Sequence, residues 1–115
     1  MVDIKERAKA LNGEIVRWRR QVHQNPELGL HTPMTETFVV ERLREMGIDE
    51  IRSGVGGHGV AALVRGKKPG KVLGMRADMD ALPVKEETGL PFASTVEGRM
   101  HACGHDAHVA ILLGT

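Results

Sequence analysis

The fold class is decided by the stretch VAALVRGKKPGKVLGM, residues 60–75. Its two short apolar runs, residues 60–64 and 72–75, contain β-branched valines and are typical of buried strands. Residues 65–70 between them are polar and include two glycines and a proline, which favour a turn. We therefore predict that the two runs pair as a β-hairpin. The glycine-rich segment 54–59 is interpreted as a flexible approach to the first strand, because no strand–loop–helix pattern surrounds it.

Helices are predicted on the N-terminal side of these strands. Apolar residues recur in steps of three and four over residues 3–24, which predicts an amphipathic helix that ends before Pro26. A second helix is predicted from Thr32, a residue type that caps open N–H groups, to Gly47, which suits the left-handed position after a last turn.

A third, strongly apolar helix is predicted from about His105 to the end of the sequence, after a long polar loop over residues 79–98. A helix that is apolar on all sides needs packing partners on all sides. We therefore interpret the chain as α/β, with an incomplete three-layer arrangement. Residues 1–115 are predicted to be the N-terminal part of a larger catalytic domain.

Length and charge exclude several classes of protein. The 115 residues permit one domain at most, and the net charge of +1 lacks the basic surplus that nucleic-acid binding needs. There is no apolar run of about 20 residues, so we expect no membrane partner. The first residues mix charge signs and do not resemble a signal peptide, and a cytoplasmic location is expected. The arginines 17, 19 and 20 are predicted to form a solvated face rather than an anion site.

The densest chemical signal is MHACGHDAH, residues 100–108. Thiolate and imidazole are preferred ligands of zinc and related divalent ions, so Cys103 and His105 are predicted to be metal ligands. A cysteine nucleophile is a weaker alternative, because a histidine adjacent in sequence seldom has the geometry of a base. For His101 and His108, a hydrogen-bonding role is at least as plausible as direct ligation.

A second signal, RADMDALP, follows the second predicted strand at residues 76–83. Ligands in α/β proteins gather beyond the carboxyl ends of strands, which suits Asp78 for a functional role at a metal site. A structural role for Asp78 is equally compatible with the sequence. Asp80 is expected to cap a turn, and Arg76 to pair with a neighbouring carboxylate.

Three motifs together resemble the start of a known family. RRQVHQNPELG at residues 19–29, GMRADMDALP at 74–83 and MHACGHD at 100–106 occur in this order. The chain in this respect is similar to metal-dependent amidohydrolases of the hippurate hydrolase, N-acyl-amino-acid amidohydrolase and auxin-conjugate hydrolase type, which are aminoacylase-like metallopeptidases. The resemblance extends over nearly the whole chain, and it implies the start of a three-layer αβα zinc-peptidase-like catalytic domain that is incomplete in these residues.

The resemblance implies a reaction and a cofactor. It implies hydrolysis of the amide bond of small-molecule N-acyl amino acids, such as hippurate, by divalent ions, two in each complete subunit. Zn, Mn, Co and Ni all suit thiolate and imidazole ligands. The family places metal ligands at Cys103 and His105 and a catalytic carboxylate at Asp78, although Arg76 stands where the wider family has a histidine ligand.

The resemblance also implies parts that these residues do not contain. The family's glutamate general base, its remaining ligands, the rest of the catalytic domain and a dimerisation domain all follow later in the chain, and the full-length form is expected to be a homo-oligomer. The alternative to an active hydrolase is therefore a truncated fragment without activity of its own, with at most residual metal binding. Two of roughly five site groups are too few to hold a dinuclear centre.

Overall fold

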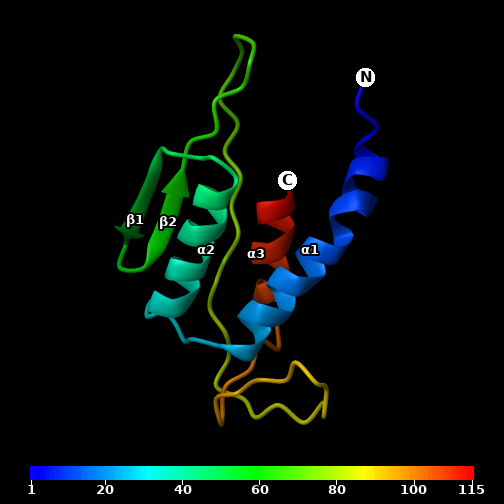
Figure 1. Ribbon diagram of the computed structural model, residues 1–115. Helices are drawn as coiled ribbons and strands as arrows, with labels where there is room; N and C mark the ends of the chain where they lie inside the picture. Colours follow the sequence, from blue (N-terminus) through cyan, green and yellow to red (C-terminus); the bar gives the residue numbers. More distant parts are fainter.

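The computed structural model describes residues 1–115 (Figure 1). Three helices and one small sheet follow each other in the order α1 (Ile4–Gln24), α2 (Pro33–Glu45), β1 (Ile51–Val55), β2 (Gly59–Ala62) and α3 (His105–Gly114). The two strands lie beside α2, and α1 and α3 lie together on its other side. No helix is long and apolar enough to cross a membrane.

Helix α1 confirms the amphipathic helix predicted over residues 3–24. Asp3 caps it by accepting a hydrogen bond from the backbone N–H of Glu6 at 3.2 Å. Only the C-terminal half of its apolar stripe is covered, because α3 packs against that half while the N-terminal turns extend past it. Val22 is therefore buried, whereas Ile4 is exposed.

Helix α2 begins and ends where the sequence predicts, but its cap is different. Thr32 occupies the cap position without a side-chain hydrogen bond. The carboxylate of Glu27 takes its place and accepts from the backbone N–H of Met34 at 3.0 Å and of Thr35 at 2.7 Å. At the other end Gly47 has φ +81°, the left-handed conformation that favours glycine.

The predicted hairpin is wrong, because β2 pairs with the segment before it and not with the one after it. Strands β1 and β2 are antiparallel, with Ile51 opposite Ala62, and residues 56–58 make the connection, so segment 54–59 is a strand end and a turn rather than a flexible approach. Gly56 and Gly57 have positive φ and form a tight connection, which brings the two strands together at lower entropic cost than the longer segment 65–70. Residues 72–75 are exposed and belong to no strand.

The core is small and lies where the three helices meet. Its buried members come from all three helices: Val22, Phe38, Val39 and Val109. Trp18 and Leu43 pack against this cluster from α1 and α2. The core therefore fixes the position of α3, on which the candidate site is built.

The long connection between β2 and α3 is held by two isolated bridges. Ala81 pairs with Leu28, and Leu82 pairs with Met100. Ala81 N–H donates to the carbonyl of Glu27 at 2.7 Å, so the segment is fastened to the chain between α1 and α2. These pairings bring residues 78–82 beside the N-terminal end of α3, so the two chemical signals of the sequence lie next to each other.

Candidate metal centre

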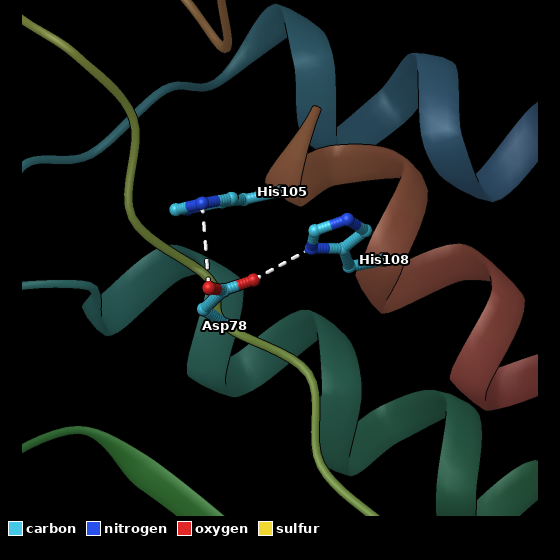
Figure 2. A group of neighbouring side chains, drawn as sticks. All are labelled: Asp78, His105 and His108. Carbon is cyan, nitrogen blue, oxygen red and sulfur yellow. Dashed lines mark hydrogen bonds and ion pairs between the residues drawn. The ribbon is translucent and has the colours of Figure 1, made fainter. Parts of the chain in front are cut away.

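Asp78, His105 and His108 form the only group of three or more His, Cys, Asp or Glu side chains with ligand atoms within 4.8 Å of one another. Asp78 lies on the long connection and the two histidines lie on the first turns of α3 (Figure 2). The carboxylate is 2.7 Å from His108 Nδ1 and 3.3 Å from His105 Nε2. Asp78 therefore bridges two imidazoles from one helix face, three residues apart.

His105 is held from its other side by Asp80. Its Nδ1 is 2.9 Å from the backbone carbonyl oxygen of Asp80 and 3.0 Å from the Asp80 carboxylate. A carbonyl oxygen only accepts hydrogen bonds, so Nδ1 carries the proton. Nε2, the nitrogen that faces Asp78, is then the atom available to a metal. A hydrogen bond from the other ring nitrogen to a carbonyl is the usual support of a histidine ligand.

The electrostatics of the group favour an ionised carboxylate. The hydrogen bond from His108 holds the pKa of Asp78 below its usual value, and positive charge on either histidine acts in the same direction, while partial burial opposes the shift. Arg76, whose guanidinium is 4.0 Å from Asp78, is 83% exposed and contributes little. The predicted pairing of Arg76 with a carboxylate is therefore present but weak.

The donor set fits a divalent transition-metal ion. Ligand bonds of about 2.1 Å in a tetrahedral site place donor atoms about 3.4 Å apart. The 3.3 Å contact between Asp78 and His105 Nε2 matches that spacing, whereas the 2.7 Å contact with His108 Nδ1 is a hydrogen bond. Two imidazoles and one carboxylate leave a fourth position free, as catalytic rather than structural zinc sites do.

Two other candidate residues lie outside this group. The thiol of Cys103 is exposed and is not among the clustered donors. His101 is buried, and neither ring nitrogen has a hydrogen-bond partner. Burial lowers the pKa of His101, which the negative charge of Asp106 opposes only in part, so this ring is neutral near pH 7.

Sequence reasoning missed a buried polar cluster behind the candidate centre. His23 on α1 contacts Asp106 on α3 through Nδ1, at 2.7 Å, and Glu86 on the long connection through Nε2, at 2.8 Å. Arg19 donates through Nε to the same Asp106 oxygen at 2.7 Å. The spacing of Arg19 and His23, four residues apart on one helix, is a signal that could have indicated a shared partner.

The predicted solvated face of arginines holds for only part of that set. Arg17 is exposed and pairs with Glu14 on the same helix. Arg20 lies over the ring of Phe92, with its guanidinium carbon 4.6 Å from the ring centroid. The prediction is wrong for Arg19, which is half-buried against Asp106. Arg19 gives this buried carboxylate a charged partner.

A small α/β unit with a carboxylate and two imidazoles together at one helix end is typical of metal-binding α/β proteins. Within that class, residues 74–115 match the model of peptidase family M20/M25/M40. The chain is 49% identical to thermostable carboxypeptidase 2 of Saccharolobus solfataricus over 96% of its length and 28% of the relative's. It is 43% identical to N-acyl-L-amino acid amidohydrolase of Geobacillus stearothermophilus, over 98% of its length and 30% of the relative's.

Solved structures give the same result. A dinuclear metal-binding peptidase of the M20 family from Bacillus subtilis superposes with a TM-score of 0.84 and 42% identity, covering 91% of this chain and 29% of that one. Over nearly its whole length the chain is similar to members of peptidase family M20/M25/M40. The predicted resemblance and the predicted α/β fold class are thereby confirmed. The chain spans about 28% of the length of the curated relatives it matches.

Proposed function

We propose that this chain supplies one part of the metal centre of a hydrolase that cleaves the amide bond of small-molecule N-acyl amino acids. The observation that carries the proposal is the group of Asp78, His105 and His108, found in a chain whose family includes a dinuclear metal-binding peptidase. Its relatives include an N-acyl-L-amino acid amidohydrolase and N-acetyldiaminopimelate deacetylases, whose names describe the removal of acyl groups from amino acids.

The residues present have distinct parts in this proposal. His105 binds a metal through Nε2, because Asp80 holds the proton on Nδ1. Asp78 stays ionised and keeps both imidazoles turned toward one point. Cys103 remains a proposed ligand, since it lies two residues before His105 and a dinuclear centre needs further donors. Bound divalent ions, of Zn, Mn, Co or Ni type, supply polarisation of an amide carbonyl and acidification of water.

The complete subunit contains more than these residues in this proposal. Residues 1–115 form the N-terminal part of the catalytic domain, and the general-base glutamate, further ligands and a dimerisation domain lie in the remaining length that the relatives have. The active form is then a homo-oligomer. The cytoplasmic location expected from the sequence stays a prediction.

The alternative is that the 115 residues have no activity alone. It is favoured by the open position at the centre and by the exposed segment 72–75, which finds no partner strand here. Metal content per chain, measured with hippurate hydrolysis on the same sample, separates the two. Metal with turnover supports a working site in this chain alone. Metal without turnover supports a centre that needs further residues. If a chain as long as the relatives also shows no metal and no turnover, the proposed function is contradicted.

A further inference from the structure

We propose that His23 and Asp106 are positioning residues for the metal centre, a role that rests on the proposed function. The pair joins α1 to α3 directly behind the two histidines that face Asp78. Asp106 is fully buried, and His23 is 2% exposed. Their contact is 2.7 Å long and joins residues that are 83 positions apart in the sequence.

The hydrogen bonds of His23 show that the cluster is tightly constrained. Both of its ring nitrogens face carboxylate oxygens, Asp106 on one side and Glu86 on the other. The ring is therefore fixed from both sides, and Arg19 adds a third contact to the cluster, from its Nε to Asp106 at 2.7 Å.

Asp106 lies at the point of α3 where the metal ligands are set. It follows His105 directly and precedes His108 by two residues. The cap residue of this helix, Gly104, has φ +96° and provides no side-chain hydrogen bond. The buried carboxylate of Asp106 therefore anchors the first turn in place of a cap. A rotation of that turn would move both imidazoles away from Asp78 at once.

A purely structural cluster would stabilise the fold without setting the direction of His105 and His108. The two roles separate because Glu86 contacts the other nitrogen of His23 and lies on the long connection, not on α3. Asp106→Asn and Glu86→Gln each remove one charge from the same cluster and keep the side-chain shape. They differ in the position of the changed residue, because Asp106 lies on α3, which carries His105 and His108, and Glu86 does not.

The test is a cobalt(II) titration of the full chain, followed by visible absorption, for wild type, Asp106→Asn and Glu86→Gln. We expect Asp106→Asn to weaken cobalt binding by about 10-fold, the low end of the effect of losing a ligand's own partner, because Asp106 acts through the helix, and Glu86→Gln to leave it nearly unchanged. Equal weakening in both variants, or none in Asp106→Asn, overturns the positioning role. Arg19→Gln, at a half-exposed position, replaces Asp106→Asn if the latter does not fold, with several-fold weakening expected.

A measurement without metal keeps this proposal separate from the proposed function. In ¹⁵N NMR spectra of the metal-free chain, the Nδ1–H of His105 reports its bond to the Asp80 carbonyl. We expect this signal to be retained in Glu86→Gln and lost in Asp106→Asn. If the signal is retained in both variants, the positioning role is overturned even where cobalt binds. If the wild-type chain shows the signal but binds no cobalt, only the proposed metal function is contradicted.

Discussion

The ring of His105 and the backbone carbonyl of Asp80 are joined by a hydrogen bond of 2.9 Å from Nδ1. This contact selects the ring nitrogen that is free, because the carbonyl can only accept. The free nitrogen, Nε2, faces the Asp78 carboxylate at 3.3 Å. One loop therefore holds both the support of His105, a proposed ligand, and the neighbouring carboxylate of Asp78.

Replacement of Asp78 by asparagine tests the donor group directly. Asp78→Asn keeps the size of the side chain but removes the charge that accepts from His108 and lies 3.3 Å from Nε2 of His105. We expect a loss of metal affinity of at least about 10-fold and a large fall in turnover of the complete enzyme, with folding intact. Isothermal titration with Zn²⁺ measures the affinity. Asp49→Asn, at an exposed position, is the control, and equal affinity in both variants would contradict a role for Asp78.

Asp80 is expected to matter less than Asp78, since its backbone carbonyl remains after side-chain truncation. Asp80→Ala removes only the 3.0 Å carboxylate contact to His105. We expect Zn²⁺ affinity to fall by no more than about 10-fold, the low end of outer-shell effects. A larger loss than in Asp78→Asn would mean that the carboxylate, not the carbonyl, holds the ring.

Cys103 and His108 are tested as a pair of alternative ligands. The proposal expects Cys103→Ala to lose metal and activity in the complete enzyme, and His108→Gln to weaken binding because it removes a clustered donor. Metal content by atomic emission, with circular dichroism to verify folding, distinguishes them. Full metal content in Cys103→Ala would remove Cys103 from the ligand set and leave Asp78, His105 and His108.

Glu86 gives the chain a sensitivity to acid. Burial by itself raises the pKa of Glu86, but hydrogen bonds from Thr88 and Ser94 and the charge of His23 outweigh it, so its folded-state pKa lies below the usual 4.5. Below pH 4.5 the unfolded chain then binds a proton more readily than the folded chain. Its stabilising contribution is therefore complete above that pH and is lost as the pH falls.

The free energy of unfolding of Glu86→Gln should accordingly fall less steeply than that of wild type between pH 7 and about pH 3. Urea unfolding at a series of pH values measures the slope. Glu87→Gln makes the same change of charge at the exposed neighbouring position and serves as the control. Parallel slopes for wild type and Glu86→Gln would show that the contacts of Glu86 do not favour its ionised form.

Two glycines should respond to alanine in opposite ways. Gly13 lies inside α1, and a methyl group added there would meet no atom within 4 Å, so Gly13→Ala should stabilise the chain by about 0.5–1 kcal/mol. At Gly59 a methyl group would overlap the carbonyl oxygen of Val55 across the hairpin, so Gly59→Ala should destabilise the chain. Thermal unfolding compares the two, and a shift of the same sign in both would contradict the assigned hairpin geometry.

The helices could be predicted from the sequence because their signals are local. The period of apolar residues over 3–24, the proline at the start of α2 and the glycine after it depend only on near neighbours in the chain. The hairpin could not be predicted, since the runs at 60–64 and 72–75 have the same apolar character. Which segment pairs with β2 depends on contacts between separate parts of the chain. The cap of α2 was misassigned for the same reason, because Glu27 reaches it from outside the helix.

The sequence by itself determined the family resemblance and the α/β class, and it singled out Asp78 and His105, two side chains that the structure brings together. Only the tertiary structure decided that His108 joins them, that Cys103 lies apart, and that His23 meets Asp106. Those outcomes depend on the directions of side chains from separate segments. Such directions are set by packing and by the pairing of buried charges, which no local pattern in the chain encodes.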